Sequence, residues 1–174
     1  GKHVILPTMN NPVKLLESLK TGFSTPLEPV VGPFSLESYP DGGVPAEQTV
    51  AALFECGGDG VVRTAAYDSH LANRTRQNNE RTWTLGDVIE FFVQAPGHDD
   101  YFEFHVTPQA RTLQLHLPDY RTLRAQTFES MLCDAGLVVS SRREGEVWLT
   151  ELRVPLVKLG AQTVDGLRFA VCRY

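Results

Sequence analysis

The sequence has little positive charge and no long apolar run. Its 174 residues contain 16 Lys and Arg against 21 Asp and Glu, a formal net charge of -5. A nucleic-acid partner is therefore not expected, because phosphate contacts need a surplus of basic side chains on one face. No apolar stretch approaches the roughly 20 residues of a membrane-spanning helix, so no membrane span is predicted.

Cysteines and catalytic motifs are also scarce. Cys56, Cys133 and Cys172 have no CxxC spacing. Their apolar neighbours favour buried free thiols, and one disulfide with a spare thiol is the alternative. The chain contains no GxSxG nucleophile elbow and no HExxH zinc motif. These absences favour binding over catalysis, and no cofactor is expected. A calcium ion held by Asp59, Asp99 and Asp100 is the alternative.

Prolines are concentrated at the start of the chain. Residues 1–49 hold seven of the eleven prolines. This density prevents long helices and leaves room only for short or edge strands. The leucines and Val13 in residues 12–20 are spaced for one face of a helix, so a short helix there is one alternative and irregular structure the other.

From residue 49 onward, short apolar stretches alternate with Gly, Asp, Asn and Pro, as is typical of successive strands. The predicted strands cover residues 50–56, 61–67, 88–94, 101–106, 112–117, 137–142, 147–155 and 167–174. Residues 120–132 are predicted as a helix or an irregular crossing. The pattern predicts an all-β, two-sheet antiparallel β-sandwich of jelly-roll type. One domain would span residues 1–174, with an irregular proline-rich portion at 1–49 and a core at 50–174.

Alternation along residues 87–117 assigns side chains to two faces of a three-stranded sheet. The predicted inner face is apolar and holds Ile89, Phe91, Val93, Phe102, Phe104, Val106, Leu113, Leu115 and Leu117. The predicted outer face holds the polar residues Glu90, Tyr101, Glu103, His105, Gln114 and His116. A loop at 95–98 would put Glu90 opposite Glu103, and a turn at 107–110 would put Glu103 beside Gln114.

This polar outer face has more than one interpretation. It resembles a surface for a polar ligand, but the outer face of any antiparallel sheet is polar, and Arg63, Arg168 or Arg173 could neutralise its carboxylates. Two facing carboxylates about 5 to 5.5 Å apart also suit a retaining glycosidase. Cross-strand neighbours meet that distance by construction, so a small glycoside-processing hydrolase is the weaker alternative.

Three segments support the ligand interpretation. They are Trp83 followed by GDVIEFFV at 86–93, YFEFHVTP at 101–108, and VWLTELRVP at 147–155 with the closing stretch 159–173. In order and spacing these segments resemble the core of family 9 carbohydrate-binding modules and the related DOMON-like domains, over about residues 50–174.

The resemblance implies a β-sandwich that binds sugars by aromatic stacking and by hydrogen bonds from acidic, amide and basic side chains. A pyranose has an apolar face that an indole can cover, while its hydroxyls need fixed polar partners. Trp83 and Glu90 match the family's aromatic and acidic positions, and Glu103 and His105 follow because they share the face. The remaining predicted ligand-binding residues are Tyr101, Gln114, His116 and Arg173.

The predicted function is a noncatalytic module that binds an oligo- or polysaccharide. The resemblance favours a secreted or periplasmic location and a neighbouring catalytic domain or partner protein. The alternative from another class is a structural or protein-interaction sandwich without sugar affinity. None of the predicted ligand-binding residues is assigned to a metal ion.

Overall fold

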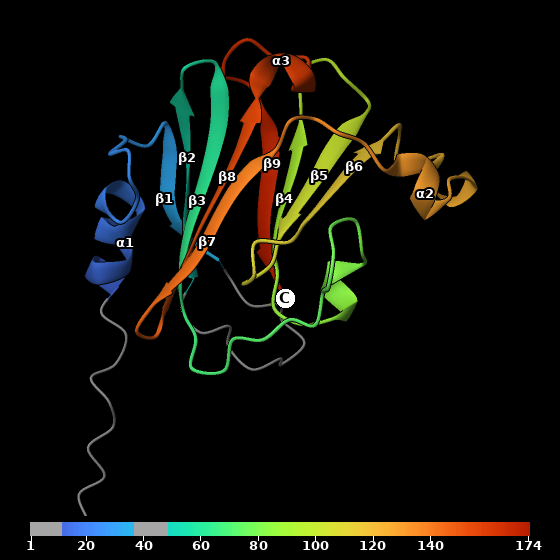
Figure 1. Ribbon diagram of the computed structural model, residues 1–174. Coiled ribbons are helices and arrows are strands. Elements are labelled where there is room, and N and C mark those ends of the chain that lie inside the picture. Colours follow the sequence, from blue (N-terminus) through green and yellow to red (C-terminus); the bar gives the residue numbers. More distant parts are fainter. Residues whose placement is uncertain (1–11, 37–48) are drawn as a thin grey trace, which may run out of the picture.

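A computed structural model describes residues 12–36 and 49–174. Its strands form two antiparallel sheets that face each other (Figure 1). The five-stranded sheet has the order β1-β2-β3-β8-β7, and the four-stranded sheet has the order β6-β5-β4-β9. The predicted all-β sandwich is confirmed.

The strands and helices of the described residues closely follow the predicted segments. The five-stranded sheet contains β1 (Val31–Ser35), β2 (Thr49–Cys56), β3 (Asp59–Tyr67), β8 (Val147–Pro155) and β7 (Val138–Glu144). The four-stranded sheet contains β6 (Thr112–Leu117), β5 (Tyr101–Val106), β4 (Ile89–Gln94) and β9 (Arg168–Arg173). The helical elements are α1 (Pro12–Thr21), η1 (Thr82–Thr84), η2 (Leu123–Ala125), α2 (Phe128–Met131) and α3 (Leu156–Leu159). All eight predicted strands are present, and β1 is a further short edge strand in the proline-rich portion.

The main hydrophobic core lies between the two sheets. Phe91 on β4 and Phe104 on β5 meet Trp148 and Leu152 from β8 there. Both phenylalanines are at most 2% exposed, so the predicted inner face of β4 and β5 is confirmed. The indole of Trp148 donates a hydrogen bond to Ser141 Oγ at 2.9 Å, which satisfies its only polar atom.

Helix α1 covers the outer face of the five-stranded sheet, so the short helix is confirmed. Leu15 and Leu19, one turn apart, are fully buried against β2 and β3. The wholly buried guanidinium of Arg63 donates to the Leu19 carbonyl oxygen at 3.1 Å and to Glu151 Oε2 at 2.8 Å. Arg63 thereby satisfies a helix-terminal carbonyl, a group that has no partner within the helix. It does not neutralise the carboxylates of the other sheet.

The register of the β4–β5 hairpin differs from the prediction. The connection covers residues 95–100, and Glu90 pairs with His105 rather than with Glu103. Glu103 instead lies opposite Phe92. Because this shift is an even number of residues, each side chain keeps its face. Glu90, Glu103 and His105 therefore still share the outer face.

The β5–β6 hairpin was predicted on the wrong register, and here the faces change. The turn covers residues 107–111, one residue longer than predicted, and Leu113 pairs with His105 while Phe104 pairs with Gln114. A one-residue shift moves every side chain of a strand to the opposite face. The leucines of β6 therefore lie outside, whereas Gln114 and His116 lie on the inner side.

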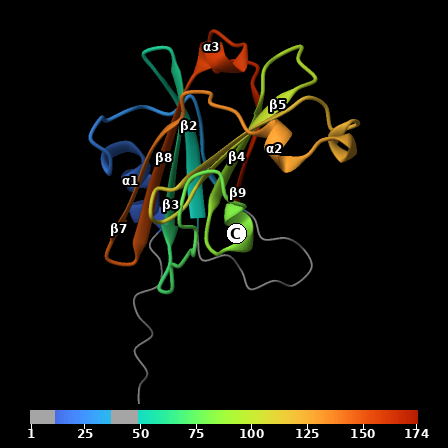
Figure 2. The same ribbon diagram turned by 45° about the vertical axis from the view of Figure 1, so that its right-hand side comes forward.

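The outward leucines of β6 are nevertheless buried. Leu113 and Leu115 pack beneath Trp83 and the segment 120–132, which supplies Leu123, Phe128, Met131 and Leu132. Each sheet thus has a cover on its outer face, and α1 and α2 lie on opposite sides of the molecule (Figure 2). No helix in residues 12–36 or 49–174 has the length and apolar character to cross a membrane.

Replacing either core phenylalanine should destabilise the fold strongly. We expect Phe91→Ala and Phe104→Ala each to lower the free energy of unfolding by about 3 to 5 kcal/mol, because each would leave a cavity between the sheets. Urea denaturation measures the change. The control is Val157→Ala, whose side chain is 75% exposed and whose loss should cost no more than about 0.5 kcal/mol. Denaturation midpoints equal to the parent in both Phe variants would contradict the face assignment.

Candidate functional site

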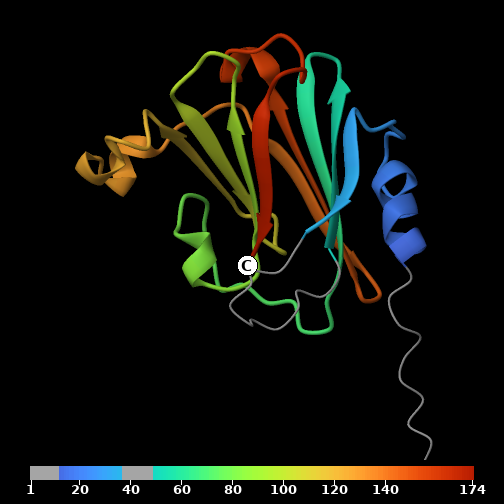
Figure 3. The same ribbon diagram turned by 180° about the vertical axis from the view of Figure 1, so that it is seen from behind.

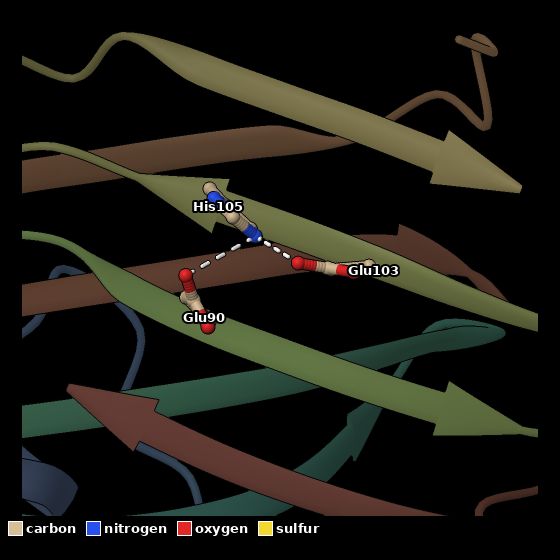
Figure 4. Close-up of side chains that lie close together, drawn as sticks. All are labelled: Glu90, Glu103 and His105. Carbon is tan, nitrogen blue, oxygen red and sulfur yellow. Dashed lines mark hydrogen bonds and ion pairs between the residues drawn. The ribbon is translucent and has the colours of Figure 1, made fainter. Parts of the chain in front are cut away.

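The outer face of β4 and β5 brings two carboxylates and an imidazole together. Glu90 comes from β4, and Glu103 and His105 come from alternate positions of β5. His105 Nε2 lies 2.6 Å from Glu103 Oε1 and 3.5 Å from Glu90 Oε1 (Figure 4). One ligand atom from each residue lies within 4.8 Å of the other two. We call these three residues the carboxylate–histidine cluster.

The cluster is buried although it lies outside the sandwich core. His105 is 0% exposed, Glu90 is 4% exposed, and the Glu103 side chain is 15% exposed. Its cover includes Thr82, whose Oγ1 lies 2.6 Å from His105 Nδ1, and Trp83, whose ring meets the imidazole edge to face at 5.6 Å between centroids. Glu103 is thus the member of the cluster nearest to solvent.

Asn73 holds this cover in place. Its side-chain amide donates to the carbonyl oxygens of Thr82 at 3.1 Å and Asp87 at 3.0 Å. The backbone of Gly86 bridges to Asn73 with a φ of 138°, and a Cβ there would come within 2.2 Å of the Ala72 carbonyl oxygen. Only glycine fits this close approach. The covering segment therefore crosses the cluster in a fixed position.

Burial raises the pKa of Glu90 above its ordinary value. The charge of His105 acts against this shift, and the charge of Glu103 adds to it. Burial also raises the pKa of Tyr101 and of Cys172, which lies opposite Glu90 on β9, and nearby carboxylates contribute to both shifts. The face therefore disfavours additional negative charge.

Glu90→Gln should stabilise the protein at neutral pH when a chelator keeps the solution free of metal ions. Below about pH 4.5, the ordinary pKa that Glu90 has in the unfolded chain, the carboxyl is protonated in both states. The folded protein then holds no buried charge at Glu90, and the stabilising contribution of this residue is fully present. As the pH rises through the raised folded-state pKa, the folded protein must ionise a buried group beside Glu103, and that contribution is lost. The amide of the variant stays neutral. Melting curves in chelator should show an advantage for the variant at about pH 7 that shrinks toward about pH 4.

Glu80→Gln is the matched control for this experiment, because its expected sign is opposite. The Glu80 carboxylate accepts hydrogen bonds from the backbone N–H groups of Gln77 and Arg76, which lower its pKa. Its contribution is present above about pH 4.5 and is lost as the pH falls through the lowered pKa. Glu80→Gln should therefore be less stable than the parent at neutral pH. A Glu90→Gln protein that melts below the parent at neutral pH would contradict the assignment of a destabilising buried charge.

A shallow hollow of about 250 Å³ lies on the same outer face. Its lining consists of Phe92, Val93, Gln94, Tyr101, Arg168, Phe169 and Ala170. Glu103 lies opposite Phe92 in the β4–β5 ladder, so the hollow adjoins the cluster. Aromatic rings, an amide, a guanidinium and a half-buried carboxylate therefore meet at one place.

The sequence prediction named one of the seven lining residues, Tyr101, and left out the other six. Alternation already places Phe92 and Gln94 on the face of Glu90, so the signal for them was present. Arg168 reaches the face because β9 pairs with β4, and the two strands lie side by side in Figure 3. In this ladder Arg168 lies opposite Gln94. Pairing between strands so distant in the chain has no local signal in the sequence.

The structure brings five of the eight predicted ligand-binding residues to one face. These residues are Trp83, Glu90, Tyr101, Glu103 and His105. Gln114 lies elsewhere, on the inner side of β6, where its Oε1 accepts hydrogen bonds from the backbone N–H groups of Ala135 and Leu137. It anchors the crossing that leads from β6 to β7.

His116 and Arg173 also lie away from the cluster. The His116 ring stacks on Phe102 with centroids 4.4 Å apart, and its Nε2 lies 2.6 Å from Asp100 Oδ2. Arg173 lies opposite Ile89 and forms an ion pair with Asp68. The structural alternative in which Arg173 neutralises Glu90 is therefore wrong, because the two side chains lie on opposite faces of the sheet.

The predicted calcium ligands have other partners in the structure. Asp99 lies 3.6 Å from Arg121, and Asp59 lies 4.0 Å from Arg153. Asp100 contacts two histidines, and these contacts lower its pKa. Within the described ranges, the group with metal-ligand spacing is the carboxylate–histidine cluster.

A larger hollow of about 620 Å³ lies on the other sheet, between the end of α1 and β7. Its carboxylate Glu151 is already bonded to Arg63, and Arg142 at its rim forms an ion pair with Glu144. The charged side chains that line this hollow therefore already have ion-pair partners. The smaller hollow offers the better match to a ligand, because it adjoins a carboxylate pair that shares one imidazole.

No family model and no curated protein matches the sequence. Solved structures do match the fold. A candidate carbohydrate-binding protein from Bacteroides uniformis has a TM-score of 0.60 at 15% identity, over 81% of this chain and 69% of that chain. A family 9 carbohydrate-binding module from Caldicellulosiruptor kristjanssonii in complex with glucose has a TM-score of 0.52 at 10% identity, over 81% of this chain and 73% of that chain.

A structure of a family 9 module from the same organism, in complex with cellotriose, has a TM-score of 0.50 at 10% identity. The matched region covers 83% of this chain and 64% of that chain. Likeness at these identities shows the fold. The resemblance to a family 9 sandwich is confirmed at that level.

Proposed function

We propose that the protein is a noncatalytic module that binds carbohydrate on the outer face of its four-stranded sheet. The observation that carries the proposal is the hollow beside Tyr101, where Gln94 and Arg168 border aromatic rings next to the Glu103 carboxylate. The fold likeness to sugar-binding modules supports it, but the argument rests on the site, because a fold alone does not specify a function.

The chemistry of this face suits a sugar. An aromatic ring can cover the apolar face of a pyranose, while amide, guanidinium and carboxylate groups can bond its hydroxyls. These groups stand on paired strands, so little conformational freedom is lost when a ligand binds. Because Glu90 is buried, we place Tyr101 and Glu103 in contact with the sugar, and Glu90 behind them.

Cellotriose and glucose are the first ligands to test, since they are the ones held by the family 9 modules with this fold. A location outside the cytoplasm and a neighbouring catalytic domain or partner protein belong to the same proposal. Both come from the family resemblance.

Loss of an aromatic side chain from this face should weaken sugar binding. We expect Tyr101→Ala to reduce the affinity for cellotriose by about 1 to 3 kcal/mol, or roughly 5- to 150-fold, through lost apolar contact. Trp83→Ala should also weaken binding, because Trp83 covers His105, which holds the Glu103 carboxylate in position. Titration calorimetry measures the change. Circular dichroism confirms that each variant is folded, because Trp83 also packs on the outward leucines.

Trp148→Phe is the control for this experiment, because Trp148 is buried between the sheets and away from the proposed site. It should leave the sugar affinity unchanged. A glycan array without retained ligands, together with association of the protein with another protein, would contradict the proposal and favour an interaction module. Equal affinities in the parent and both aromatic variants would exclude this face.

A further inference from the structure

The carboxylate–histidine cluster brings three possible metal ligands close together. Ligand atoms on a tetrahedral zinc ion lie about 3.3 Å apart, given zinc–ligand distances of about 2.0 to 2.2 Å. The corresponding separations here include 2.6 Å from His105 Nε2 to Glu103 Oε1 and 3.5 Å to Glu90 Oε1, and all three ligand atoms lie within 4.8 Å of one another. Small side-chain rotations would bring all three to one ion. We propose that Glu90, Glu103 and His105 bind a divalent transition-metal ion, with zinc as the expected occupant.

The balance of charge at the cluster supports a cation. Glu90 is 4% exposed, and its ion-pair partner among the described residues is His105, which the Glu103 carboxylate approaches more closely. No lysine or arginine in residues 12–36 or 49–174 forms an ion pair with either carboxylate. One imidazole therefore serves two carboxylates, and a buried charge is costly unless it is paired.

The hydrogen bonds of His105 lead to the same conclusion. If Nδ1 carries the proton and donates it to Thr82 Oγ1, at 2.6 Å, the lone pair of Nε2 points at the Glu103 carboxylate, at 2.6 Å. Two acceptors at that distance repel unless a cation joins them. If Nε2 carries the proton instead, it satisfies Glu103, and Glu90 keeps only its 3.5 Å contact. With a neutral ring, in either tautomer, a metal ion would complete the site, whereas in a doubly protonated ring the second proton takes that place, so a metal ion and this proton would compete for Nε2.

The donor set selects the kind of ion. Calcium and magnesium prefer oxygen ligands throughout, whereas zinc accepts imidazole nitrogen together with carboxylate oxygen. Thr82 on Nδ1 is the outer partner that metal-bound histidines commonly have, and it fixes the ring orientation. Three protein ligands leave a fourth position for water, as in open zinc sites. This inference does not depend on sugar binding at the neighbouring hollow.

Zinc titration of the whole chain, treated first with a chelator, tests the proposal. Calorimetry should show one equivalent bound by the parent, and zinc should raise its melting temperature. Glu103→Gln should weaken zinc binding at least tenfold, while the protein stays folded because this side chain lies at the edge of the cluster. Thr82→Val should weaken it by about 10- to 100-fold, the usual effect of losing an outer partner.

His116→Gln is the matched control, since His116 also lies 2.6 Å from a carboxylate but outside the cluster. It should bind zinc like the parent. Cobalt(II) distinguishes the donors: the complex should lack the intense charge-transfer band of a thiolate ligand, and Cys172→Ser should leave its spectrum unchanged.

Glu90→Gln gives a second, independent readout. This variant should melt above the parent in chelator and gain little from zinc, so excess zinc should reverse the order. A folded parent that binds no zinc at millimolar concentration would overturn the proposal. Zinc binding that Glu103→Gln leaves intact, or that Cys172→Ser or His116→Gln abolishes, would overturn it equally.

Discussion

The pairing of Glu90 with His105 across the β4–β5 ladder is the constraint on which the outer face depends. It places a carboxylate and an imidazole on adjacent strands, and Glu103 completes the group from two residues along β5. Such a group is stable under a cover only if its polar atoms have partners. Thr82 on the covering segment supplies one of them, so the path of residues 68–88 and the pairing of the strands support each other.

The same outer face combines apolar and polar chemistry in neighbouring areas. The outward leucines of β6 and Trp83 form an apolar cover at one side, while Gln94 and Arg168 border the hollow at the other. Tyr101 belongs to both areas. A sugar ring needs both kinds of contact, and the buried cluster would hold Glu103 in position between them.

The prediction of the elements succeeded because it used local information. Period-2 alternation identified β4 and β5 and correctly buried Phe91 and Phe104. The registers failed because each depends on the length of a turn, and Ala110, with a φ of 60°, lies in a left-handed conformation that no local signal indicated for alanine. One additional residue in that turn moved Gln114 and His116 to the inner side and removed them from the face of Glu90.

The sequence by itself determined the class of fold, the eight strands and the faces of β4 and β5, because hydrophobic alternation is a property of each strand alone. Tertiary structure decided which residues share a site. Arg168 meets Gln94 only because β9 returns beside β4, and Arg173 pairs with Asp68 because the same strand directs alternate side chains to opposite faces. The position of Thr82 and Trp83 over His105 was likewise decided by contacts between segments distant in the chain.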